Sequence, residues 1–134
     1  MRLIADDALA AITIFQEAEG EPFEGKVAVA EVIRNRMARR FMSDGTVAGT
    51  VLRAFQFSGF NTMSSNRVRS FKIDADNPIV EDCLRAWATA RMGSNTVKGA
   101  DSYVNLGLAD PKWARGKKPV ASVGRHSFYR VEGD

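Results

Sequence analysis

Residues 22–41 constrain the fold most, because a helix built from them is apolar on most of its sides. Pro22 stands where such a helix would begin, and the N–H that proline lacks has no partner in a first turn. A stripe at helical spacing follows, and further apolar residues widen it: Phe23, Val27, Ala28, Val29, Ala30, Val32, Ile33, Met37 and Phe41. A helix with so wide an apolar surface needs cover from several elements, so we expect it to be central and buried.

Other helices are expected to cover it. Residues 6–18 are predicted as a helix that Asp6 or Asp7 caps and Gly20 ends. Its apolar face holds Ala8, Ala11, Ile12 and Phe15. Two more helices are predicted, at residues 47–54 and 77–92, and the second of them starts at the Asn-Pro pair and stops before Gly93.

The remaining segments lack helical periodicity. Residues 56–76 are polar and are expected to form a long ordered loop or short hairpin of the kind that lines a site. Short extended pieces are predicted at residues 102–105, 120–123 and 126–129, between glycines and prolines. The predicted fold class is therefore α+β, mainly helical with a few short strands, in one domain that spans residues 1–134.

Composition excludes several classes of protein. No apolar run approaches the ~20 residues that a membrane-spanning helix needs, and Asp6 and Asp7 interrupt a signal peptide. Cys83 is the only cysteine, so no intrachain disulfide can form, and we expect it to be a small core residue. The single histidine, His126, excludes a His-rich metal site. We therefore expect no metal and no cofactor.

Four glutamates crowd the turn between the first two helices: Glu17, Glu19, Glu21 and Glu24. Glu21 and Glu24 flank Pro22 at a helix start, where the macrodipole favours negative charge. Glu17 and Glu19 lie in the last turn of a helix, and the negative end of the helix dipole repels their carboxylates. Glu17 also shares a helical row with Ala10, Thr13 and Ile14, so burial and the dipole should both raise its pKa, as a general acid requires. The alternative is that both carboxylates are solvated and slightly unfavourable.

The glutamate-rich turn and three later stretches resemble the SleB-type cell wall hydrolases, a family that includes spore-cortex-lytic enzymes and phage lysins. The opening stretch, EAEGEPFEGKVAVA, matches a Glu-Ala-x-Gly-Glu-Pro-x-Glu-Gly block, and its helix continues to an Asn-Arg pair. The later stretches lie in the same order as in the family and are FQFS at residues 55–58, GADSYVN at residues 99–105, and Trp113 with GRHSFY at residues 124–129. Together the matches span residues 17–129.

The resemblance implies a lysozyme-like domain that acts on peptidoglycan as a lytic transglycosylase, with Glu17 as the catalytic acid. It also implies that Tyr103, Asn105 and Gln56 bind the sugar or orient Glu17, with Ser58 and His126 as further candidates. Structural roles stay open for each: a sheet edge or turn for Tyr103, Asn105 and Ser58, a loop anchor for Gln56, and a hydrogen-bonded core position for His126. Trp113 is expected to pack rather than to stack on sugar.

Two features depart from the family pattern. Glu31 stands where the family usually has a small residue, and its role is left open, with pairing to an arginine such as Arg34 as one option. Residues 59–77 have no counterpart that can be aligned, so substrate contacts there are not carried over.

The predicted partner is the glycan strand of peptidoglycan, with no nucleic acid and a monomeric enzyme. Lys plus Arg exceed Asp plus Glu by 19 to 16, a mild excess that suits any anionic polymer. Two alternatives remain: a hydrolytic muramidase of the same fold, and a basic nucleic-acid-binding module. The lone domain without a secretion signal is typical of a phage endolysin, which would stay in the host bacterial cytoplasm until release to the wall.

Overall fold

A computed structural model describes residues 2–53 and 77–132 of the chain. Its helices are α1 (Arg2–Ala18), α2 (Phe23–Arg39), α3 (Val47–Val51) and α5 (Pro78–Arg91), and η2 (Lys112–Ala114) is a short 3-10 helix. Its strands are β1 (Ser102–Val104), β2 (Ala121–Val123) and β3 (His126–Tyr129). The predicted mainly helical α+β fold is confirmed. The predicted loop at residues 56–76 lies outside the described residues.

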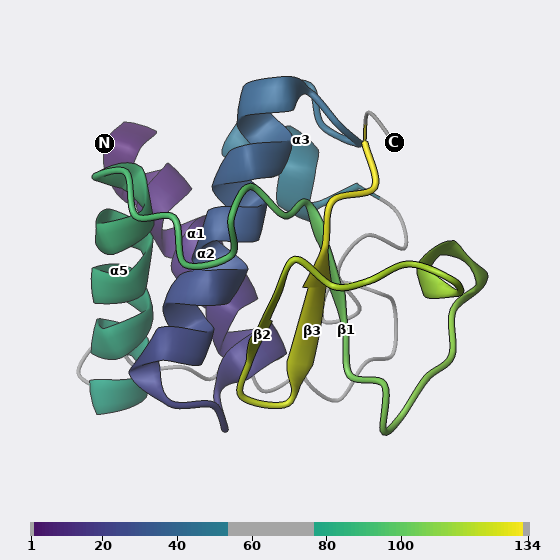
Figure 1. The fold of residues 1–134 in the computed structure, drawn as a ribbon. Coiled ribbons are helices and arrows are strands. Elements are labelled where there is room, and N and C mark those ends of the chain that lie inside the picture. Colours follow the sequence, from purple (N-terminus) through teal and green to yellow (C-terminus); the bar gives the residue numbers. More distant parts are fainter. Residues whose placement is uncertain (1, 54–76, 133–134) are drawn as a thin grey trace.

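Helix α2 is the central element, as its wide apolar surface predicts. It lies between α1 and α5 on one side and the sheet on the other (Figure 1). Val29 and Ile33 pack into a core cluster with α1 and α5, whereas Ala28 and Val32 pack against Val97 and Phe128 of the sheet side. Because α2 contributes to both core clusters, it needs apolar residues on two sides rather than on a single stripe.

The two ends of α2 differ from the predicted stripe. Phe23 is 38% exposed, with the Arg85 guanidinium 5.4 Å from its ring centroid, so this aromatic residue packs at the surface. The helix ends at Arg39, because Arg40 adopts a left-handed φ of 52°. Phe41 therefore lies beyond the helix, where its N–H donates to Arg36 O at 3.0 Å and closes the helix end.

The predicted start of α1 is wrong, because the helix begins at Arg2 and includes both aspartates. Asp7 does not cap the helix; its Oδ1 accepts a hydrogen bond from Trp87 Nε1 at 3.0 Å, which ties α1 to α5. The buried face is also rotated from the predicted one, since Ala8 is exposed while Ala10 and Ile14 are fully buried. Contact with three partner helices, α2, α3 and α5, decides this face.

The other helices follow their sequence signals. Asn77 Oδ1 caps α5 by accepting the Ile79 N–H at 2.8 Å, and Gly93, with φ of 105°, follows its end. Cys83 is fully buried in the core, as expected. Helix α3 is only five residues long and ends at Val51, earlier than predicted, with Leu52 as its C-cap. None of the helices in residues 2–53 and 77–132 is long and apolar enough to span a membrane.

The three short strands form an antiparallel sheet in the order β1-β3-β2. Tyr103 of β1 pairs with Phe128 of β3, and Ala121 of β2 pairs with the same Phe128 from the other side. Phe128 is fully buried against α2, which anchors the sheet. This pairing places β1 and the β2–β3 turn beside the C-terminal end of α1, so residues from three distant parts of the chain meet at one corner.

Candidate functional site

A small open cleft lies where the α1–α2 turn meets the β2–β3 turn. Its volume is about 200 Å³, and its lining residues are Glu17, Ala18, Gly20, Glu21, Asn105, Arg125 and His126. The cleft is smaller than the roughly 300–1,000 Å³ of a pocket that encloses a drug-sized ligand. It therefore suits contact with one part of a long substrate that lies across the surface. Three predicted site residues, Glu17, Asn105 and His126, meet there.

Glu17 reaches the cleft because of its place in the last turn of α1. Ala10, Thr13 and Ile14, which precede it on the same helical row, are all 0% exposed. The earlier part of this row lies in the core. Because α1 ends just after Glu17, the Glu17 side chain reaches the edge of the core and is only half-buried. The local sequence thus places a carboxylate between the apolar core and solvent, as predicted.

Tyr103 lies directly behind this carboxylate. Its hydroxyl donates a hydrogen bond to Glu17 Oε1, which joins two residues that are 86 positions apart in the sequence. Burial raises the pKa of the Tyr103 phenol well above 10, and the adjacent Glu17 charge and hydrogen bond raise it further. Tyr103 therefore keeps its proton at neutral pH and acts as a fixed donor to Glu17. The geometry fits the predicted orienting role.

His126 packs edge-on against the ring of the same tyrosine. The two ring centroids are 5.0 Å apart at an interplanar angle of 71°, and His126 Nδ1 lies 3.5 Å from Glu21 Oε1. Burial lowers the pKa of His126; the Glu21 charge opposes this effect, and Arg125 adds to it. The imidazole is therefore a mainly neutral side chain that lines the cleft and packs on Tyr103. Its buried Nδ1 forms no hydrogen bond with the described residues, which differs from the hydrogen-bonded core position considered from sequence.

Glu21 was interpreted from sequence as a simple helix-start charge, and that interpretation is incomplete. Its carboxylate Oε1 accepts the backbone N–H of Arg125 at 3.1 Å, so it holds the β2–β3 turn against the α1–α2 corner. Two glycines leave room for it: a Cβ on Gly124 would lie 2.9 Å from Glu21 Oε1, and one on Gly25 would lie 2.8 Å from its Cβ. No spacing rule signals this contact, although all three residues belong to the matched motifs.

Of the other predicted site residues, one lines the cleft and two lie outside the described residues. Asn105 lines the cleft, but its Oδ1 accepts the Gly107 N–H at 3.0 Å, so it also forms a turn. Gln56 and Ser58 lie outside the described residues. Trp113 packs edge-on against Tyr129, with centroids 5.4 Å apart, and remains 37% exposed.

Glu31 does not pair with Arg34. The Glu31 carboxylate is fully buried and accepts hydrogen bonds from Ser94 Oγ at 2.6 Å and from the Val97 N–H at 2.9 Å. Arg34 instead donates to the carbonyls of Ala90 and Ser94. Both side chains fasten the connection after α5 to α2, so Glu31 is structural and remote from the cleft in its contacts.

Two alternatives to this cleft among the described residues would be a metal cluster and a second hollow. Among the residues that the structure describes, no group of three or more His, Cys, Asp or Glu side chains is placed to hold a metal ion. A larger hollow of about 600 Å³ lies at the other end of α1, beside Asp6, Asp7 and Trp87. Asp6 is eleven positions before Glu17, ~16 Å along the helix. We therefore assign the chemistry to the cleft that holds Glu17.

Known proteins resemble this chain in sequence. A family model described as Cell Wall Hydrolase matches residues 20–129. The spore cortex-lytic enzymes of Oceanobacillus iheyensis and Bacillus subtilis are 29% and 28% identical to it over 123 residues. The matched part is 92% of this chain but only 41% and 37% of those enzymes. The chain thus spans about two fifths of the length of these relatives.

Solved structures share its fold. The catalytic domain of the Bacillus cereus SleB protein matches with a TM-score of 0.75 and 27% identity, over 92% of this chain and 88% of that one. The catalytic domain of the germination-specific lytic transglycosylase SleB from Bacillus anthracis matches with a TM-score of 0.72 and 28% identity, over 92% of each chain. These likenesses confirm the SleB-type resemblance and the lysozyme-like fold that the sequence predicted.

Proposed function

The chain belongs to the cell wall hydrolase family, and from this premise we propose that it cuts peptidoglycan as a lytic transglycosylase. The bond broken is the β-1,4 bond from MurNAc to GlcNAc, and Glu17 is the acid. One observation carries the proposal: the Tyr103 hydroxyl donates to the Glu17 carboxylate at the wall of an open cleft. The description of the Bacillus anthracis SleB domain as a lytic transglycosylase supports the reaction type.

The first step uses Glu17 in its protonated form. The carboxyl proton moves to the glycosidic oxygen, and the bond from MurNAc C1 to that oxygen breaks with its electron pair on the oxygen. GlcNAc leaves with a free 4-hydroxyl, and positive charge develops at C1. The new Glu17 carboxylate receives the Tyr103 hydrogen bond, so this phenol stabilises the charge that proton transfer leaves behind.

The second step needs no water. The 6-hydroxyl of the same MurNAc attacks C1, and its proton returns to the Glu17 carboxylate as the 1,6-anhydro ring closes. The nucleophile belongs to the same sugar, so its effective concentration is high. One carboxylate therefore serves as acid and then as base, unlike the two that ordinary glycosidases need. Two further cleft residues with polar side chains, Asn105 and Arg125, are available to contact the sugar or its substituents.

The proposal is tested by mass spectrometry of the fragments that wild type and Glu17→Gln release from purified sacculi. We expect fragments ending in 1,6-anhydro-MurNAc from the wild type and a loss of at least about 10³-fold in their rate of release from the variant. Absence of fragments from the wild type on every sacculus type would overturn the enzyme assignment. Unchanged release by Glu17→Gln would overturn the role of Glu17.

The same spectra separate the reaction from its alternative, a hydrolytic muramidase. Reducing MurNAc ends would require a second carboxylate to direct water. Glu21 would then be the first candidate, because it is the other acid that lines the cleft, whereas Glu31 is buried against Ser94 and Val97. The phage endolysin role, the storage in a host cytoplasm and the monomeric state stay predictions.

A further inference from the structure

We propose that Asp101 is a positioning residue that fixes the start of β1 against α2 and thereby keeps the Tyr103 hydroxyl on Glu17. The inference rests on the proposed function, since it gives Asp101 a part in the reaction of Glu17. Asp101 itself is 0% exposed and does not line the cleft, so it takes no direct part in proton transfer.

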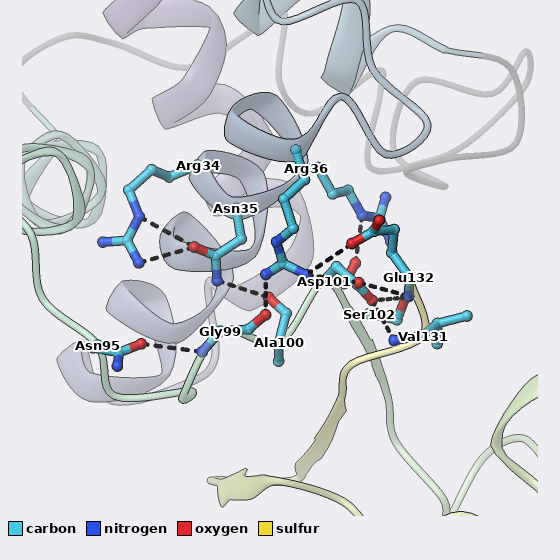
Figure 2. Close-up of polar contacts among 11 residues, drawn as sticks. Arg34, Asn35, Arg36, Asn95, Gly99, Ala100, Asp101, Ser102, Val131 and Glu132 are labelled. Carbon is cyan, nitrogen blue, oxygen red and sulfur yellow. Dashed lines mark hydrogen bonds and ion pairs between the residues drawn. The ribbon is translucent and has the colours of Figure 1, made fainter. Parts of the chain in front are cut away.

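Three polar side chains of α2 hold the backbone just before β1. Asn35 Nδ2 donates to Ala100 O at 2.8 Å, Arg36 Nε donates to Asp101 O at 2.5 Å, and Arg39 Nη2 donates to Gly99 O. Three successive carbonyls are therefore bound by one helix, and Figure 2 shows Asn35 and Arg36 pointing from α2 toward this segment. The Asn-Arg pair at the end of the apolar helix thus has a structural use that the sequence did not reveal.

The Asp101 carboxylate completes this attachment from the other side. Its Oδ1 accepts the Val131 N–H at 2.8 Å and the Ser102 hydroxyl at 3.0 Å. Its Oδ2 accepts the Glu132 N–H at 3.0 Å and an Arg39 N–H at 3.1 Å. One buried charge therefore joins α2, the start of β1 and the segment after β3, as Figure 2 shows.

Tyr103 is two residues further along β1, on a strand of only three residues. A strand this short has few ladder hydrogen bonds of its own, so its position depends on how its ends are held. The Tyr103 hydroxyl is at the far end of a long side chain, where a small tilt of the strand becomes a large displacement. Misplacement of a catalytic group by ~1 Å can cost ~100-fold in rate.

The test substitutes Asp101→Asn, which keeps the shape but removes the charge and replaces one acceptor oxygen with a donor. Glu31→Gln is the matched control, because Glu31 is an equally buried carboxylate that bonds Ser94 and Val97 instead. We expect Asp101→Asn to lower kcat on sacculi by ~10–100-fold with little change in KM. Glu31→Gln should change kcat by less than about 3-fold, because it leaves the Tyr103 position intact.

A second measurement needs no substrate. Tyr103 and Tyr129 are the only two tyrosines, so in a Tyr129→Phe background the absorbance at 295 nm reports the ionisation of Tyr103. In the parent the Tyr103 phenol should ionise only well above its ordinary pKa of about 10, whereas a Tyr103 released from its packed place should titrate near that value. We expect the tyrosinate midpoint to fall toward about 10 in Asp101→Asn and to stay at the parent's value in Glu31→Gln, with far-UV circular dichroism confirming that each variant stays folded.

A double-mutant cycle decides between positioning and general destabilisation. If Asp101 acts through Tyr103, adding Asp101→Asn to Tyr103→Phe should cost less than about 2-fold further. Full additivity of the two losses, or an unshifted Tyr103 titration in Asp101→Asn, would overturn the inference. Arg39→Gln tests the same attachment, with a smaller loss expected, if Asp101→Asn fails to fold. Failure of the proposed function would appear separately, as a wild type that releases no fragments.

Discussion

Gly124→Ala is expected to unfold the cleft corner for two separate reasons. Gly124 has a φ of 58°, in the left-handed region that a residue with a Cβ adopts at a cost. The added Cβ would also lie 2.9 Å from Glu21 Oε1, the same oxygen that accepts the Arg125 N–H at 3.1 Å. The carboxylate must therefore move away, and the contact that holds the β2–β3 turn is lost.

The two costs can be estimated separately. The left-handed conformation costs about 1–2 kcal/mol for a residue such as alanine. The hydrogen bond to the carboxylate lies at a surface turn, so we assign it the value of an ordinary hydrogen bond rather than that of a buried charged one, about 1–1.5 kcal/mol. The free energy of unfolding should then fall by about 2–3.5 kcal/mol. With an unfolding entropy of ~2.1 cal/mol/K per residue, this lowers Tm by roughly 7–12 °C for a chain of this length.

Thermal unfolding followed by circular dichroism measures the effect, and Gly116→Ala is the matched control. Gly116 has a φ of 75°, but a Cβ there has no other heavy atom within 4 Å, so only the backbone cost applies. We expect a Tm decrease of roughly 4–7 °C for the control. Effects of Gly→Ala on the unfolded chain are shared by both variants and cancel in the comparison.

A third variant isolates the contact itself. In a Glu21→Ala background, Gly124→Ala should cost no more than Gly116→Ala does, because the carboxylate that it displaces is gone. If Gly124→Ala and Gly116→Ala lower Tm equally in the wild-type background, Glu21 is not held by the turn and the reasoning fails. The same result would remove Glu21 as the link between the α1–α2 corner and His126.

Two predictions concern titratable groups. His126 is the only histidine, and burial lowers its pKa, so its C2-proton NMR titration should have a midpoint below about 6.5. As pH falls, the unfolded chain binds the proton before the native protein does, so this histidine lowers stability between about pH 6.5 and the lower native midpoint. His126→Gln should remove that part of the decrease in stability. A native midpoint above about 6.5 would contradict the prediction. Burial raises the pKa of Cys83 to about 12, so little of the native thiol is a reactive thiolate at pH 8. Ellman's reagent at that pH should therefore label the unfolded chain but leave the native thiol unmodified. Rapid labelling of the native protein would disprove this prediction.

Local patterns determined most of the fold. The wide apolar surface of residues 22–41 predicted a central helix, and the Asn-Pro start and Gly93 stop predicted α5, because both are properties of neighbouring residues. The start of α1 was not predictable in this way. Asp7 is a good cap by type, but its carboxylate bonds Trp87, which is 80 positions away. A local rule cannot weigh a partner that only tertiary packing supplies.

The candidate site shows the same division. Sequence alone determined that Glu17 lies on a buried helical row at a helix end, because helical periodicity fixes which side chains share a face. Only the tertiary structure decided that Tyr103 donates to it, that Glu21 holds the β2–β3 turn, and that Asp101 fastens the start of β1. These contacts join residues 30 to 104 positions apart, and their geometry depends on how α2 packs against the sheet, which no local pattern encodes.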